Sequence, residues 1–296
     1  MQTAIGIDLG ATNIKGVLID GNGSLLHQLT GETREHDQQH WKQAVAEMIK
    51  TLESKSAHHV NAFGLSAPGL ADEHNQSIAF MPGRLAGLEN FNWSDAIGKK
   101  IHVLNDAHAA LMAEATFGAG KGMKHLVLLT LGSGVGGGIL INGNLYQGLG
   151  QMAGHFGHST IDASTHVQDV TNMPGSIEVA IGNVTVEART HGHYHSTKSL
   201  VAAYERHDPF ATWVWLSSVQ KLAACVASSV NIVSPEAVIL SGGITKAGDS
   251  LMKPLLSFLE KYEWRPGGKQ TPVLLARFSD MAGAMGAAAF ALSRSK

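Results

Sequence analysis

Two polar residues, Asn105 and Asp106, stand where an apolar segment ends and a run of helix-forming residues begins. The apolar segment covers residues 101–104, and the helical run covers residues 109–115. A strand that passes into a helix here places polar side chains at its carboxyl end, where open α/β sheets usually hold ligands. Asp106 is therefore a candidate general base. The alternative is that both residues only cap the helix, which is a common role for Asn and Asp.

Glycine-rich turns elsewhere in the chain could hold a nucleotide, because phosphate oxygens approach backbone N–H groups closely only where residues are small. The first turn, residues 8–16, contains Asp8, Gly10 and Thr12. The Thr12 hydroxyl can donate a hydrogen bond, and Asp8 could hold hydrated Mg²⁺. No Gly-Lys-Ser/Thr follows, so this is not a Walker A loop. The alternative is an ordinary hairpin turn.

Two further turns contain Gly132 and Gly134 in residues 132–138, and Gly242 and Gly243 after the apolar residues 237–240. The apolar strands on both sides of residues 132–138 argue against a flexible linker. Two glycines at 242–243 would let a planar adenine or a ribose lie against the backbone. The alternative for that pair is a turn that opens a helix.

The order of elements that would position these residues occurs twice in the chain. We expect a strand, a glycine-rich turn, a second strand and a Gly/Asn turn near residues 3–25 and again near 125–146. The first copy predicts three consecutive antiparallel strands joined by hairpin turns. Apolar spacing predicts helices over residues 39–54, 210–231, 249–261 and 281–292. The last consists of small residues, so it can pack closely on another element. The pattern indicates two related halves, each with its own sheet, that face one another across a cleft.

The composition fits a globular protein. The chain has 296 residues, of which 44% are hydrophobic, enough for one large or two ordinary domains with buried cores. The net charge is −2 without a block of Lys or Arg, so we expect no nucleic-acid and no membrane partner. We also expect no signal peptide, no spanning helix, and a buried thiol at Cys225, the single cysteine. These features favour the cytoplasm.

Seven segments, in order along the chain, resemble the motifs of the ROK family of sugar kinases, within the actin/hexokinase/Hsp70-type ATPase superfamily. They are residues 6–12, 66–69, 105–107, 131–138, 154–158, 175–178 and 240–243. The resemblance implies an α/β fold of two actin-like (ribonuclease H-like) domains, with mixed sheets flanked by helices and a cleft between them. It implies an N-terminal domain of residues 1–107 plus 281–296 and a C-terminal domain of residues 108–280.

The resemblance also implies an ATP-dependent sugar kinase that uses Mg²⁺ and forms a homodimer. Asp106 is then the catalytic base, and Asp8 holds the metal through water. The implied sugar-binding residues are Gly69, Asn105, His155, His158 and Glu178. The implied ATP-binding residues are Asp8, Gly10, Thr12, Gly132, Gly134, Gly242 and Gly243. Which hexose or N-acetylhexosamine is phosphorylated stays open.

Three departures from the family pattern are visible. Ala11 and Asn13 replace the usual Gly and Lys, and His155 replaces a Glu that usually contacts the sugar. The family also binds zinc through the histidine at His158 and three cysteines. Asp169, Thr171 and Ser176 stand at the cysteine positions, so we expect no structural zinc. A mixed metal site of His155, His158, His166 and Asp169 is the open alternative.

Other functions remain as rivals. ROK members include repressors with an N-terminal DNA-binding domain, and here none is expected because the first phosphate-binding strand begins at residue 3. A non-catalytic sugar-binding or sensing protein is the main alternative, motivated by His155 and Asn13. A kinase of the same fold that acts on a non-sugar substrate is another.

Overall fold

The computed structural model describes residues 2–295, without the side chain of Gln38. The chain folds into two compact units. Unit 1 comprises Met1–Met123, Ile139–Ala153 and Arg277–Lys296, and unit 2 comprises Lys124–Gly138 and Gly154–Ala276. The sequence predicts domain boundaries at residues 107/108 and 280/281. These boundaries stay a prediction, and the two compact units are defined by their own bounds.

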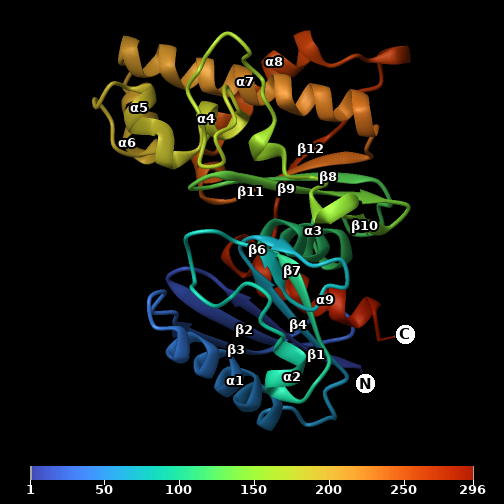
Figure 1. The fold of residues 1–296 in the computed structure, drawn as a ribbon. Helices are drawn as coiled ribbons and strands as arrows, with labels where there is room; N and C mark the ends of the chain where they lie inside the picture. Colours follow the sequence, from blue (N-terminus) through green and yellow to red (C-terminus); the bar gives the residue numbers. More distant parts are fainter. Residues whose placement is uncertain (1, 296) are drawn as a thin grey trace. The chain divides into compact units, whose positions relative to one another are not determined.

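The sheet of unit 1 has the strand order β3-β2-β1-β4-β7 (Figure 1). The first three strands are antiparallel, as the sequence predicts, and β4 and β7 run parallel to β1, which makes the sheet mixed. The strands are β1 (Thr3–Leu9), β2 (Asn13–Asp20), β3 (Leu25–Glu32), β4 (Ala62–Ala67) and β7 (Ile101–Asn105). A small hairpin of β5 (Leu70–Ala71) and β6 (Ile78–Phe80) and the helix α2 (Trp93–Ile97) lie between β4 and β7 along the chain.

Helices cover both faces of this sheet. Helix α1 (Gln38–Ser54) packs on β1, β2 and β3, with Trp41, Val45 and Leu52 fully buried. Helix α9 (Ala282–Ser293) packs on β1, β2, β4 and β7, and α3 (Asp106–Phe117) packs on α9. Figure 1 shows α1 and α9 on opposite sides of the strands.

The small residues of α9 allow a very close approach to the sheet. A Cβ atom at Gly6 of β1 would lie 1.9 Å from the carbonyl oxygen of Ala284, and one at Gly64 of β4 would lie 2.0 Å from that of Ala287. The helix can therefore contact the strands only where both surfaces lack bulk. The sequence-based prediction of a small-residue helix that packs closely is confirmed.

The second sheet has the order β10-β9-β8-β11-β12, which matches the first sheet strand for strand. Its strands are β8 (Leu126–Leu131), β9 (Val135–Ile141), β10 (Asn144–Tyr146), β11 (Ala237–Ser241) and β12 (Val273–Leu275). Strands β8, β11 and β12 are parallel, and β9 and β10 are antiparallel. The two related halves that the sequence indicates are therefore present as two mixed sheets.

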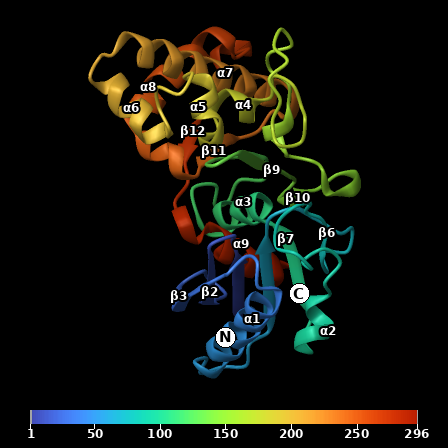
Figure 2. The same cartoon turned by 60° about the vertical axis from the view of Figure 1, so that its left-hand side comes forward.

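The helices of unit 2 surround the long helix α7 (Pro209–Val233), which packs on α4 (Ile177–Ile181), α6 (Thr197–Glu205) and α8 (Asp249–Tyr262). Figure 2 shows α7 and α8 side by side. Residues 150–195 contain only short helices, among them α4, α5 (Val186–Arg189) and the 3-10 turns η1 (Leu149–Gln151) and η2 (Phe156–His158).

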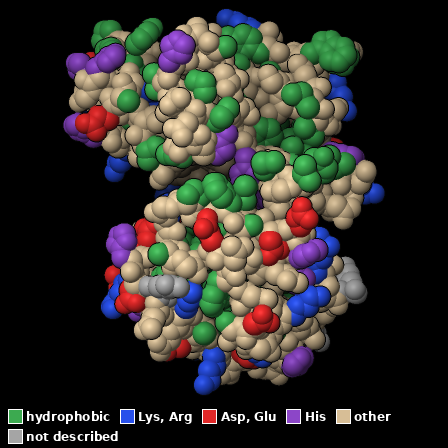
Figure 3. All heavy atoms as spheres, viewed as in Figure 1, with side chains coloured by type: hydrophobic (Ala, Val, Ile, Leu, Met, Phe, Trp, Pro, Cys, Tyr) green, Lys and Arg blue, Asp and Glu red, His purple; other side chains and the backbone are tan. Residues whose placement is uncertain are grey.

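Helix α7 is the one described helix long and apolar enough to cross a membrane by length and composition. Half of its apolar window is buried against the rest of the chain, as is usual for a core helix. Cys225 lies on this buried face as a free thiol, as expected. On the face drawn in Figure 3, Lys and Arg side chains are spread among Asp and Glu side chains.

Candidate active site

Asn105 and Asp106 lie at the junction of β7 and α3, where the sequence indicates a strand that passes into a helix. The Oδ1 atom of Asn105 accepts hydrogen bonds from the N–H groups of Ala107 at 2.9 Å and His108 at 3.2 Å. Its Nδ2 atom donates to the carbonyl oxygen of Gly69 at 2.9 Å. Asn105 therefore caps α3, and the same side chain holds Gly69 beside the strand end.

Asp106 is the first residue of α3, and its Oδ1 atom accepts a hydrogen bond from the N–H of Ala107 at 2.8 Å. The side chain reaches water, but the protein atoms packed around the carboxylate desolvate it and raise the pKa of Asp106. The hydrogen bond from Ala107 and the charge of Arg84 oppose that rise in pKa. Because a raised pKa makes a carboxylate more basic, Asp106 has a property that a general base requires.

Asp8 lies in β1 beside Ser66 of β4, whose Oγ donates to Asp8 Oδ1 at 2.6 Å. Burial raises the pKa of Asp8 to about 6, and the charge of Asp106 adds to the rise, while Ser66 and Lys15 oppose it. Two carboxylates that repel one another in this way favour a cation beside them. Sequence analysis placed Ser66 in the motif of residues 66–69 but gave it no role in the site.

Gly10 and Thr12 lie in the tight turn between β1 and β2. The N–H of Gly10 donates to the carbonyl oxygen of Asn13 at 3.0 Å and closes a hairpin turn between these two strands. Thr33 holds it from the side: its N–H donates to the carbonyl oxygen of Thr12 at 3.0 Å, and its Oγ1 donates to that of Gly10 at 2.6 Å. The side chain of Thr12 is exposed and available to a ligand.

In unit 2, Gly132 and Gly134 form the turn between β8 and β9, closed by a hydrogen bond from Gly132 N–H to the carbonyl oxygen of Gly134 at 2.9 Å. Glu178 lies against this turn, and its Oε2 atom accepts a hydrogen bond from the N–H of Val135 at 2.9 Å. A Cβ atom at Gly134 would lie 2.2 Å from the same oxygen. The fold therefore brings Glu178 and the second glycine-rich turn together.

The glycines that follow this turn belong to β9, which begins at Val135. The prediction that residues 132–138 form one turn is therefore wrong for residues 135–138. Gly137 shows the physical reason for glycine in this strand. A Cβ atom there would lie 2.5 Å from the carbonyl oxygen of Leu128 and 2.6 Å from the ring of Phe156, so glycine permits close packing.

A cavity of about 820 Å³ lies within unit 2 and is lined by Gly132 and Gly243, one residue from each of two predicted nucleotide-binding turns. Gly242 makes the sharp turn out of β11 with φ of 93°, where a Cβ atom would lie 2.4 Å from the carbonyl oxygen of Leu131. Other lining residues are Ser133, Asn183, Thr197, Lys198, Val201, Ala202, Glu205, Ile244, Lys246 and Ala247.

Sequence analysis missed the charged lining residues Lys198, Glu205 and Lys246. Lys246 follows Gly243 by three residues, and this spacing was a signal. Lys198 and Glu205 lie on α6 without any motif, and only the fold brings them to the cavity. Two ammonium groups in one cavity suit an anionic ligand such as a phosphate chain.

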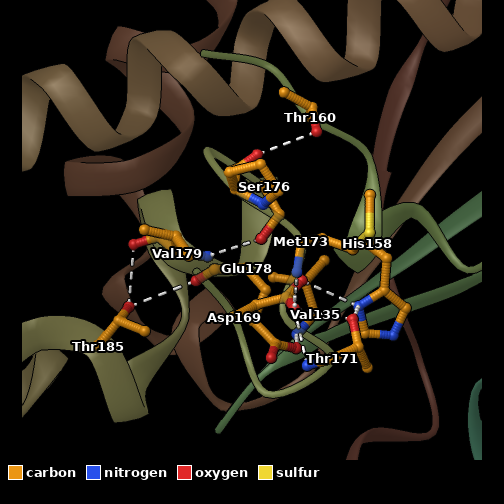
Figure 4. A network of polar contacts seen from close by, with 11 residues as sticks. Val135, His158, Thr160, Asp169, Thr171, Met173, Ser176, Glu178, Val179 and Thr185 are labelled. Carbon is orange, nitrogen blue, oxygen red and sulfur yellow. Dashed lines mark hydrogen bonds and ion pairs between the residues drawn. The ribbon is translucent and has the colours of Figure 1, made fainter. Parts of the chain in front are cut away.

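His158 ends the turn η2 and belongs to a polar network in unit 2 (Figure 4). Its Nδ1 atom lies 3.0 Å from Asp169 Oδ2 and 3.1 Å from Thr171 Oγ1. The Asp169 side chain has no exposed area, whereas about a third of the His158 side chain is exposed. His155 precedes this turn, and its carbonyl oxygen accepts a hydrogen bond from the N–H of His158 at 3.3 Å.

The predicted site residues thus form two sets. Unit 1 holds Asp8, Gly10, Thr12, Gly69, Asn105 and Asp106, and unit 2 holds Gly132, Gly134, His155, His158, Glu178, Gly242 and Gly243. The family model described as the ROK family matches residues 4–294. This chain belongs to the ROK family. The match spans both units, as the seven motifs did.

Two ROK relatives resemble the chain over nearly its whole length. A glucokinase of Thermotoga maritima is 30% identical and covers 98% of this chain and 97% of its own length. The solved structure of a ROK hexokinase from Thermus thermophilus is 26% identical, has a TM-score of 0.89 and covers 99% of both chains. The expected fold of two actin-like domains with mixed sheets is confirmed. A xylose repressor of Bacillus spizizenii is 30% identical over 54% of this chain and 42% of its own length.

The positions implied for a family zinc site do not fit zinc in this ROK chain. Structural zinc is held by thiolates and imidazoles, but Asp169 and Thr171 bind the His158 ring by hydrogen bonds. Ser176 Oγ accepts a hydrogen bond from the N–H of Val179 at 3.3 Å and caps α4. Within residues 2–295 no group of three or more His, Cys, Asp or Glu side chains is arranged to hold a metal ion. The mixed site of His155, His158, His166 and Asp169 is therefore not formed.

Proposed function

We propose that this chain is an ATP-dependent kinase that phosphorylates a hydroxyl of a hexose or an N-acetylhexosamine. The observation that carries the proposal is the junction of β7 and α3, where Asp106, Asn105 and Gly69 are held together at a strand end. The glucokinase and hexokinase among the ROK relatives support it. Phosphoryl transfer asks a protein mainly for positioning, for neutralisation of charge and for a base.

Asp106 would act as the base that accepts the proton of the attacking sugar hydroxyl. Its partial exposure lets a hydroxyl approach, and its raised pKa favours proton transfer. The sugar would be held by Gly69, Asn105, His155, His158 and Glu178. The Nδ2 group of Asn105 has a second hydrogen besides the one that it donates to Gly69, and the Glu178 carboxylate is an acceptor, which suits a ligand rich in hydroxyls.

The phosphate and nucleoside ends of ATP would use the glycine-rich turns. Gly10 and Thr12 of the first turn and Gly132 and Gly134 of the second would bind phosphate, and Gly242 and Gly243 would border the adenosine. The cavity that Gly132 and Gly243 share supports this assignment, because Lys198 and Lys246 add positive charge to it.

Mg²⁺ fits beside Asp8. A desolvated carboxylate with a pKa of about 6, next to a second carboxylate, gains from a nearby cation. Asp8 would hold the ion through water, as hydrated Mg²⁺ prefers. When bound, Mg²⁺ supplies neutralisation of the phosphate charge.

The decisive experiment compares the wild-type chain with Asp106→Asn in an ADP-release assay with Mg²⁺-ATP and a panel of hexoses and N-acetylhexosamines. We expect kcat to fall by about 10²–10⁴-fold, the usual contribution of a general base, because the amide cannot accept the proton. Sugar binding measured by calorimetry should change little, because the amide keeps the shape of the side chain.

Asp95→Asn is the matched control, because Asp95 is also an acidic residue in the first turn of a helix. Near-normal turnover in Asp106→Asn would remove Asp106 from the role of base. If no sugar is phosphorylated although calorimetry detects sugar binding, the non-catalytic sugar-sensing function becomes the better one. The presence of a xylose repressor among the relatives supports this alternative.

Four further expectations belong to the same proposal. ROK membership favours a homodimer. The sequence composition favours the cytoplasm and a chain without a nucleic-acid partner or a membrane partner. Light scattering on the purified full chain tests the oligomeric state directly.

A further inference from the structure

The Nδ1 atom of His158 faces two oxygen atoms (Figure 4). One is Asp169 Oδ2 at 3.0 Å and the other is Thr171 Oγ1 at 3.1 Å. Which ring nitrogen of a histidine carries the proton follows from the groups that each nitrogen meets. The hydrogen-bond partners of Asp169 and Thr171 therefore decide whether Nδ1 of His158 carries a hydrogen.

Asp169 is an acceptor at both of its oxygens. Its Oδ1 accepts hydrogen bonds from the N–H groups of Thr171 at 2.8 Å and Met173 at 3.0 Å. The hydroxyl of Thr171 also donates to Oδ1, at 2.7 Å, and three donors at one oxygen favour the ionised form of a carboxyl group. Asp169 is therefore a carboxylate at neutral pH and has no proton to donate to His158.

Thr171 is also an acceptor toward the ring. Its hydroxyl donates to Asp169 Oδ1 at 2.7 Å, so its one hydrogen is directed at the carboxylate. The lone pairs of Oγ1 remain for His158. With acceptors at both neighbouring positions, Nδ1 must carry a hydrogen.

We propose that Asp169 and Thr171 keep a hydrogen on Nδ1 of His158, so that in the neutral ring Nε2 is a hydrogen-bond acceptor for a sugar hydroxyl. The sugar part of this inference rests on the proposed function, and the tautomer does not. About a third of the His158 side chain is exposed although its Nδ1 edge is covered, so the ring edge open to a ligand carries Nε2. Asp169 and Thr171 are positioning residues that act through His158.

The proposal explains what Asp169 and Thr171 do at positions where the family has cysteines. A metal bound at Nδ1 leaves the ring hydrogen on Nε2, so that Nε2 is a donor, whereas a carboxylate that accepts from Nδ1–H leaves Nε2 with a lone pair. Because the sugar group at Nε2 must donate, it has to be a hydroxyl or another group that carries hydrogen. A fluorine or a methoxy group at that position cannot donate and would bind more weakly.

Asp169→Asn is the variant that reverses the tautomer. The N–H groups of Thr171 and Met173 hold the acceptor oxygen of residue 169, so the new Nδ2 group would face His158. An amide that donates to Nδ1 moves the histidine hydrogen to Nε2. The geometry of the loop stays nearly the same, because Asn and Asp have the same shape.

The tautomer is read directly by ¹⁵N NMR of the imidazoles in the ligand-free full chain, with the His158 signals assigned from a His158→Gln sample. We expect Nδ1–H in the wild-type chain and in Thr171→Val, which keeps the carboxylate, and Nε2–H in Asp169→Asn. Glu187→Gln is the matched control, because Glu187 pairs with His195 in an exposed position. An Nε2–H signal for His158 in the wild-type chain would overturn the proposal.

The sugar part is tested with whichever sugar of the panel the wild-type chain phosphorylates and with its monodeoxyfluoro analogues. In Asp169→Asn we expect KM for that sugar to rise by about 10–100-fold, the range for one lost hydrogen bond, with KM for ATP nearly unchanged. For the analogue with fluorine at the hydroxyl that contacts Nε2, KM should differ much less between the wild-type chain and Asp169→Asn. A sugar KM within about twofold of wild type in Asp169→Asn contradicts the sugar role. A chain without kinase activity removes the proposed function and this sugar role together, while the NMR result still decides the tautomer.

Discussion

At the scale of single residues, burial raises the pKa of the Asp8 carboxylate to about 6. A buried carboxylate with a pKa of about 6 is protonated in the folded chain at pH values where the unfolded chain has lost the proton. This contribution to the free energy of unfolding is fully present below about pH 4 and is lost as the pH rises through about 6.

Asp8→Asn should therefore become more stable relative to the wild-type chain as the pH rises from about 4 to 7, by on the order of 2 kcal/mol. The amide oxygen can still accept the hydrogen bond of Ser66, so the change mainly removes the titration. Urea unfolding of both chains without Mg²⁺ measures the difference. A stability difference that does not vary with pH would show that Asp8 titrates normally.

At the scale of elements, Glu114 joins the end of α3 to the segment before α9. Its side chain has no exposed area. Its Oε1 accepts hydrogen bonds from the N–H groups of Arg277 at 2.8 Å and Phe278 at 2.9 Å, and its Oε2 accepts from Ala119 N–H at 2.8 Å. These N–H groups belong to segments far apart in the sequence, so the carboxylate holds the helix pair in place.

Glu114→Gln should destabilise the chain by about 2–4 kcal/mol, because the new amide group must face at least one buried N–H group. Glu53→Gln is the control: Glu53 forms an ion pair with Lys99 and its side chain is 31% exposed, so the loss should be about 1 kcal/mol or less. Urea unfolding of both variants compares the two costs. Equal losses would mean that the buried carboxylate has no special role.

At the scale of the whole molecule, the chain should fold without a structural metal. The segment around His158 and Asp169 is held by hydrogen bonds, so removal of transition metals takes away no folding free energy. After treatment with EDTA, we expect the Tm of the ligand-free chain to change by less than about 1 °C. Kinase activity should be lost with EDTA and restored by Mg²⁺ alone. A clear drop in Tm that Zn²⁺ reverses would contradict this expectation.

The sequence by itself determined the order of the elements and much of the first site. Local patterns carry this information, because a strand that ends at Asn-Asp and a helix of small residues are encoded by consecutive residues. The predicted strands 3–7 and 101–104 and the predicted helices 39–54 and 281–292 correspond to β1, β7, α1 and α9. The resemblance in seven motifs added the family, because motif order survives when side chains between the motifs change.

Only the tertiary structure decided which distant residues meet. Glycines 136–138 had the composition of a turn, but they belong to β9, where the lack of a side chain at Gly137 permits close packing against Leu128 and Phe156. The partners of His158, the lysines at the cavity and the contact of Glu178 with Val135 join residues from separate segments. Such contacts form only when segments that are distant in the sequence pack against one another. Local patterns of residue types do not specify which segments meet.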